Sequence, residues 1–231
     1  MSEGIDTADL DASVEAWALT FVEPGGPAPD RLPPEWRPVL DAVDSGTRRD
    51  AALALWNPDL LALIPQFADA LRHHFLDVRV GVTGEGIPAL AYVAPGLSPG
   101  EFHVWVGYAP EAFGAEPQFW SSFAPPLQTF LRTVHAGFTC ETLTSFGPCR
   151  PAYMETVAEQ ADSPEGIPGW DDDVDIPSTR LLIITEDGGI LRYCVSPDLG
   201  PTQLALVEPG EAEPVDLGPA LDKLLMWRLE N

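Results

Sequence analysis

The segment at residues 180–195 reads RLLIITEDGGILRYCV, and it determines the fold class more than any other stretch of this 231-residue chain. Residues 180–185 are almost continuously apolar, and residues 190–195 form a second apolar run. The EDGG sequence between the two runs is typical of a tight turn, so the segment predicts a β-hairpin. A third strand is expected at residues 203–207, after the loop SPDLGP.

Helices are expected on both sides of these strands. A helix should begin at Pro125-Pro126 and end near Gly137, because the apolar residues between them recur at helical spacing. These residues are Leu127, Phe130, Leu131 and Val134. The chain closes with a second helical pattern at residues 217–229, which has leucines on one face. Strands that are grouped together and flanked by helices indicate the α+β class.

The first half of the chain predicts helices followed by a short β-meander. The apolar residues of 11–22 recur at helical spacing and predict a first helix. A longer helix is expected to begin at Pro58, and Pro65 is expected to kink or split it. The hydrophobic period then changes to that of strands, which are expected at residues 78–82, 87–94 and 102–108. The segment PEAFGAEP that follows is typical of a boundary. We therefore predict two units, residues 1–118 and residues 119–231.

Three segments of the second half carry a family resemblance. They are APPLQTFLRTVHAGF at residues 124–138, the hairpin at residues 180–195, and VDLGPALDKLLMWRL at residues 215–229. In this order they resemble the SUKH superfamily (Smi–Knr type), and Gly169-Trp170 loosely matches a Gly-Trp pair that these proteins often carry before a core strand. The family helix usually lies near the N-terminus, whereas here residues 1–118 precede it, and the resemblance implies no role for them.

The resemblance implies a mixed or antiparallel sheet flanked by helices in residues 119–231. Many bacterial members of the superfamily look like immunity proteins of polymorphic toxin systems. The implied function is therefore the neutralisation of a cognate toxin domain by stoichiometric occlusion, without catalysis. The alternative is a non-enzymatic regulatory or scaffold binding protein of the same superfamily.

The net charge limits the classes of partner. The chain has 36 acidic and 12 basic residues, a formal net charge of −24. A chain this acidic is repelled by phosphate backbones and by anionic membrane surfaces, which excludes nucleic acid and membrane as expected partners. Charge complementarity instead favours a basic protein, such as a nuclease toxin.

The carboxylates are densest in one segment of the second half. Between Arg150 and Arg180 there are eight acidic residues and no basic one, and the run ends in GWDDDVD. The predicted partner-binding residues are Trp170, Asp171, Asp172, Asp173, Asp175 and Glu165. The alternative interpretation is a solvated loop. An EF-hand is excluded, because the sixth and twelfth positions counted from Asp171 are Ile176 and Leu182.

No pattern in the chain is typical of a catalytic, metal or cofactor site. The chain has no G-x-S-x-G elbow and no C-x-x-C pair. His135 and Cys140 are close in sequence, but His135 follows a helix and is expected at the surface, near the negative end of the helix dipole. We therefore expect no enzyme activity and no cofactor. Trp227 is expected to lie in the core with most of the other tryptophans.

The cysteines, the N-terminal segment and the length of the apolar stretches indicate the cellular location of the protein. Three cysteines, Cys140, Cys149 and Cys194, are too few and of the wrong parity for a disulfide framework. The N-terminal MSEGIDTADLDAS lacks the basic and apolar regions of a signal or transit peptide. No stretch approaches the roughly 20 apolar residues that a transmembrane helix needs. These features predict a cytoplasmic protein with reduced thiols.

Overall fold

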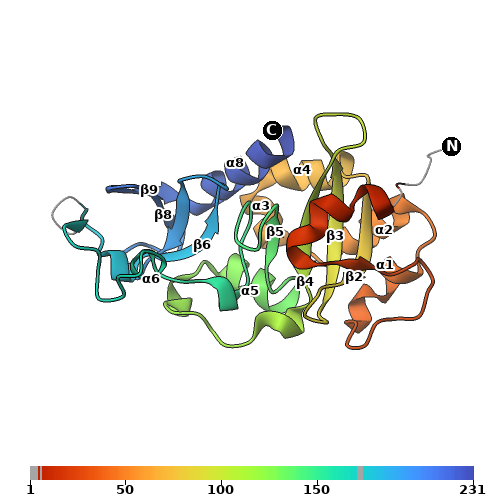
Figure 1. Ribbon diagram of the computed structural model, residues 1–231, viewed down its shortest axis with the longest axis horizontal. Coiled ribbons are helices and arrows are strands. Elements are labelled where there is room, and N and C mark those ends of the chain that lie inside the picture. The colour runs from red at the N-terminus through yellow and green to blue at the C-terminus, as the bar shows by residue number, and fades with distance from the viewer. Residues whose placement is uncertain (1–4, 6, 171–173) are drawn as a thin grey trace.

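The computed structural model describes residues 5, 7–170 and 174–231, and it shows an α+β protein. Two sheets, which we name sheet A and sheet B, lie next to one another along the long axis of the molecule (Figure 1). All neighbouring strands in both sheets are antiparallel. The predicted fold class is therefore confirmed.

Sheet A contains the predicted meander. Its strands, in spatial order, are β1 (Thr20–Phe21), β2 (Asp77–Val82), β3 (Pro88–Pro95), β4 (Phe102–Tyr108) and β5 (Phe138–Cys140). The first and last of these strands were not expected. Residues 11–22 were predicted as a helix, but they form a 3-10 helix at Asp11–Trp17 and then β1. Leu19, which lies between them, packs against Gly81 of β2. Any side chain at position 81 would clash with Leu19.

Sheet B contains the predicted hairpin. Its strands, in spatial order, are β6 (Leu182–Glu186), β7 (Arg192–Val195), β8 (Gln203–Glu208) and β9 (Glu211–Asp216). The hairpin and the third strand are confirmed. The strand β9 was not expected, because its sequence EAEPVD is acidic and contains a proline. It forms a strand by pairing along its whole length with β8.

The helices cover the two sheets. They are α1 (Arg37–Asp41), α2 (Ser45–Leu53), α3 (Pro58–Leu63), α4 (Pro65–His73), α5 (Pro125–Thr133), α6 (Val157–Gln160) and α8 (Leu217–Glu230). As predicted, Pro65 splits the longer helical segment, because proline lacks the N–H that would continue the ladder of the preceding helix. Among the described residues, no helix has both the length and the apolar character needed to cross a membrane.

The predicted boundary at residues 118/119 does not separate two structural units. Strand β5 belongs to the second predicted unit, yet it pairs with β4 of the first. Asp222 of α8 is buried and accepts hydrogen bonds from the backbone N–H groups of Gln66 (3.1 Å) and Phe67 (2.9 Å) at the start of α4. Figure 1 shows α8 running from sheet B towards α4. The proline- and glycine-containing segment before residue 118 is thus a connection over the surface of one continuous core.

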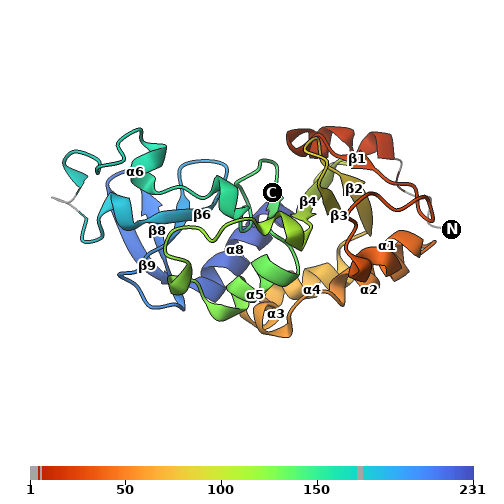
Figure 2. The same cartoon turned by 90° about the horizontal axis from the view of Figure 1, so that it is seen from below.

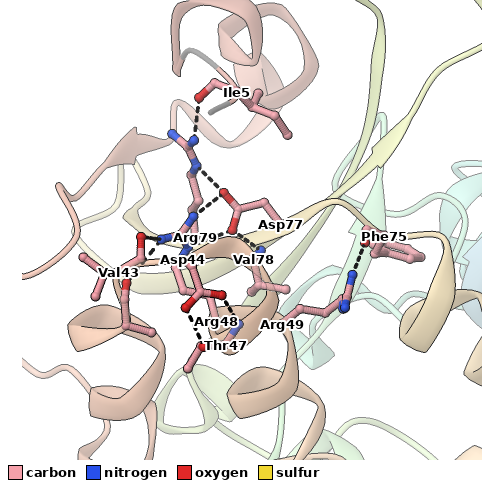
Figure 3. Close-up of polar contacts among 11 residues, drawn as sticks. Ile5, Val43, Asp44, Thr47, Arg48, Arg49, Phe75, Asp77, Val78 and Arg79 are labelled. Carbon is pink, nitrogen blue, oxygen red and sulfur yellow. Dashed lines mark hydrogen bonds and ion pairs between the residues drawn. The ribbon is translucent and has the colours of Figure 1, made fainter. Parts of the chain in front are cut away.

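A buried ion cluster ties the helices to sheet A (Figure 3). Asp77 is 1% exposed and accepts two hydrogen bonds from Arg48, at 2.7 and 2.8 Å, and one from Arg79 at 2.9 Å. Arg48 also donates to the carbonyls of Ala42 and Val43, which lie between α1 and α2. One carboxylate therefore holds the α1–α2 connection against β2.

Candidate partner-binding surface

Trp170, the aromatic residue of the predicted site, lies in the core and not on the surface. It is 8% exposed, and its Nε1 donates to the carbonyl of Ile176 at 2.9 Å. It packs in a second apolar cluster, together with residues of α6 and of one face of sheet B. Trp170 is therefore not an exposed anchor, but it lines a small pocket together with Val157 and Glu208, and its part in partner binding stays a prediction.

The carboxylates of the predicted site are only partly described. Glu165 and Asp175 are exposed, and Asp171, Asp172 and Asp173 lie outside the described residues. Of the described residues that flank them, Trp170, Val174 and Ile176 pack with Cys194, Ala205 and Val207 on the α6 side of sheet B. The role of the acidic segment stays a prediction.

A groove lies on the opposite face of sheet B, between its strands and α8. Figure 2 shows α6 and α8 on the two sides of this sheet. The groove has a volume of about 580 Å³. It is lined by Asp187, Leu191, Tyr193, Leu206, Val215, Asp216, Pro219, Ala220, Lys223, Leu224 and Trp227. We name these eleven residues the α8 groove.

Trp227 is the most prominent apolar side chain of the α8 groove. It was expected in the core, but it is 49% exposed. One face of its ring stacks on Phe146, with centroids 5.6 Å apart and an angle of 18° between the planes. A Trp fixed by stacking on one side and open on the other is preorganised for contact with a partner, because little side-chain entropy remains to be lost. The exposure of Trp227 could have been predicted from the helical spacing, because Trp227 lies about 200° around α8 from buried Leu225.

Carboxylates border the α8 groove. In the register of β8 and β9, Glu208 lies opposite Glu211, and Leu206 of the groove lies opposite Glu213. Because side chains alternate between the faces of a strand, this register directs all three glutamates to the groove side of their strands. Glu208, at the end of β8, also lines a small pocket with Val157 and Trp170 on the α6 side. All three are exposed, and none forms an ion pair within the described part of the chain. We name Glu208, Glu211 and Glu213 the acidic rim.

The charge of the acidic rim is not balanced locally. Lys223 is the only cation among the groove residues that the structure describes. Arg192 of β7 lines a pocket together with Glu208 but forms its ion pair with Glu186, and Arg180, at the end of the 3-10 helix Ser178–Arg180, pairs with Asp198. Like charges directly opposite one another in a strand pair are destabilising. A cationic partner would therefore relieve a repulsion that exists in the free protein.

His135 does not lie at the surface as expected. It is fully buried, its Nε2 is 2.8 Å from the Tyr92 hydroxyl, and its ring is stacked on Phe138. Burial lowers its pKa to about 3. The ring fits beneath sheet A because residue 107 is glycine, where a Cβ would lie 2.6 Å from the imidazole. An imidazole in this state cannot act as a base towards a molecule in solvent.

The cysteines are buried free thiols. Burial raises the pKa of Cys140 to about 12, and burial also raises the pKa values of Cys149 and Cys194. Since the thiolate is the nucleophile and the metal ligand, these protonated thiols are poorly suited to either role. Among the described residues, no group of His, Cys, Asp and Glu side chains is arranged to hold a metal ion.

Comparison of the chain with protein-family models, with curated proteins and with solved structures found no match.

Proposed function

We propose that this protein binds a basic protein partner through the α8 groove and its acidic rim, and that the partner is a toxin domain which the protein neutralises by stoichiometric occlusion. The observation that carries the proposal is an open apolar groove, with a half-exposed Trp227, bordered by carboxylates that lack cationic partners. Interfaces of this kind combine a buried aromatic anchor with a charged rim.

The charge supports a toxin that acts on nucleic acid. Nucleases bind phosphate and are therefore basic. A protein of net charge −24 attracts such a domain over a distance of roughly the Debye length, about 8–10 Å at physiological salt. Electrostatic steering of this kind raises the association rate and falls as the salt concentration rises. Rapid capture would favour the survival of a cell that makes its own toxin.

The direct test uses the candidate toxin domain that the proposal expects to be encoded beside this gene. Purified toxin and the full chain are mixed at low and at physiological salt, and complex formation and residual toxin activity are measured. The proposal expects a 1:1 complex and complete inhibition at equimolar protein. If no complex forms at low salt, the proposed function is wrong.

Trp227→Ala is expected to weaken the complex by about 2 kcal/mol, roughly 30-fold in Kd, because the anchor of the groove is lost. The loss should appear mainly as faster dissociation and should change little with salt. Surface plasmon resonance gives both rate constants. The matched control is Leu97→Ala, which removes another exposed apolar side chain far from the groove in sequence and is expected to leave Kd unchanged.

Two acidic groups, the acidic rim and the predicted acidic segment, can be compared directly. The triple variant Glu208→Gln, Glu211→Gln and Glu213→Gln is expected to slow association about tenfold at low salt and much less at high salt. The control triple variant Glu35→Gln, Asp59→Asn and Glu111→Gln removes the same charge from other exposed positions.

The second group is the predicted acidic segment. Replacing Asp171, Asp172, Asp173 and Asp175 together by Asn should also weaken binding more at low salt than at high salt if the toxin contacts that segment. If binding is unchanged at both salt concentrations, the segment is a solvated loop and not a contact surface for the toxin. The same measurements on the rim variant then show whether the toxin contacts the acidic rim.

A further inference from the structure

We infer that the α8 groove receives a basic amphipathic helix of the partner, and not an added β-strand, a second copy of this chain or a small apolar molecule. This inference rests on the proposed function, because it names the element through which the partner binds. It follows from the shape of the groove, from the edges of the two sheets and from the sign of the rim charge.

The groove is elongated along α8. The lining residues of this helix recur every three or four positions, from Asp216 at its N-terminal cap through Ala220 and Lys223 to Trp227. With a rise of 1.5 Å per residue, this side of α8 spans about 16 Å, or three turns. The opposite wall is the apolar surface of β7 and β8. A trough with these walls matches the row of apolar side chains that a helix presents at i, i+3, i+4 and i+7.

Addition of a strand is disfavoured at the neighbouring edge. β9 is the last strand of sheet B in the described order, and pairing at its free side needs backbone N–H donors. Pro214, in the middle of β9, has no N–H, and prolines and charges on an edge strand are common protections against pairing. β1, at the edge of sheet A, has two residues only.

The remaining sheet edges are covered by the chain itself. The outer side of β5 is bonded by Cys140 N–H to the carbonyl of Ser145, and by Phe138 N–H to the carbonyl of Pro148. The outer side of β6 is bonded by Cys149 N–H to the carbonyl of Ile184. A strand from a partner would have to displace these segments.

The sign of the rim excludes a second copy as the preferred occupant. In a two-fold symmetric dimer the same patch lies on both sides, so the acidic rim of one protomer would face that of the other. A helix with Lys or Arg beside its apolar row instead places cations against Glu208, Glu211 and Glu213. The same three carboxylates give a small apolar molecule no favourable contact.

The test uses two peptides of about 14 residues, both made of equal numbers of Leu and Lys. In one, Leu residues lie on one face of a helix; in the other, Leu and Lys alternate, as in a strand. Binding to the full chain is measured by fluorescence anisotropy at physiological salt. We expect the helical peptide to bind at least tenfold more tightly than the alternating one, and its circular dichroism to become more helical on binding.

Ala220→Trp tests the position of the bound peptide. This change fills the groove without altering charge, and it should weaken binding of the helical peptide at least tenfold. Ala115→Trp, at an exposed loop position, is the matched control and should have no effect. Equal binding of the two peptides, or full binding to Ala220→Trp, would overturn the inference, as would a dimer of the free protein in light scattering that Ala220→Trp dissolves.

The toxin domain separates the two proposals. If the toxin binds, and Ala220→Trp weakens neither toxin nor peptide, neutralisation of a toxin stands, but binding through the α8 groove and the helix-binding inference are both wrong. If the helical peptide binds in the groove and the toxin does not bind at all, the groove stands as a helix acceptor and the proposed function is wrong. Pro214→Val restores the missing N–H of β9, and an increase in toxin affinity in this variant would show strand addition instead.

Discussion

Asp77→Ala is expected to lower the free energy of unfolding by about 3–5 kcal/mol, because it leaves the guanidinium of Arg48 buried without its counter-charge. The side chains of Arg48 and Asp77 are 8% and 2% exposed, so solvent does little to replace the lost carboxylate. Arg79 loses its ion-pair partner in the same change. Urea denaturation followed by circular dichroism measures the effect.

Two further variants show whether burial is the reason. Asp41→Ala breaks the exposed pair of Arg37 and Asp41 and is expected to cost less than about 1 kcal/mol. The double variant Arg48→Met with Asp77→Leu should be more stable than Asp77→Ala alone, because the buried charge of Arg48 is removed together with its partner, while Arg79, 12% exposed, is unpaired in both variants. A loss below 1 kcal/mol for Asp77→Ala would contradict the assigned role of the cluster.

Acidification is expected to destabilise the protein through His135 by about 4 kcal/mol as the pH falls from 6.5 to 3.5. The folded-state pKa of His135 is lowered to about 3 from the ordinary value of 6.5. Between these values the unfolded state binds a proton that the folded state cannot accept. The stabilisation is therefore fully present above pH 6.5 and is lost at about 1.4 kcal/mol per pH unit below it.

His135→Phe isolates this contribution. Phe keeps the aromatic packing against Phe138 and removes the proton acceptor, while the Tyr92 hydroxyl still accepts from Trp56 Nε1 at 3.1 Å. Carboxylates such as Asp198, whose pKa is lowered by Arg180, contribute to acid unfolding in both proteins. The difference in unfolding free energy between the two proteins should therefore shift by several kcal/mol in favour of His135→Phe between pH 7 and pH 4. Parallel stability curves would contradict the prediction.

Much of the fold could be predicted from local patterns. The hairpin β6–β7, the strands β2 to β4 and the split of the helix at Pro65 all follow from residue period and turn chemistry within about twenty neighbouring positions. Strand β9 could not be predicted, because EAEPVD has no strand preference of its own and is ordered by its neighbour β8. The location of His135 was predicted wrongly for a similar reason. Its burial depends on the absence of a side chain at Gly107, which is distant in sequence.

For the candidate site, too, some features follow from the sequence and others only from the tertiary structure. The sequence by itself determined the fold class of the protein and its surplus of carboxylates, since these depend on local period and composition, and the surplus is the basis on which we predict a basic partner. Only the tertiary structure decided which carboxylates border an apolar surface. The pairing of β8 with β9 aligned three glutamates on one face, and the docking of α8 left Trp227 open while the packing of α6 buried Trp170. These outcomes depend on contacts between distant segments, whose register and packing no local pattern specifies.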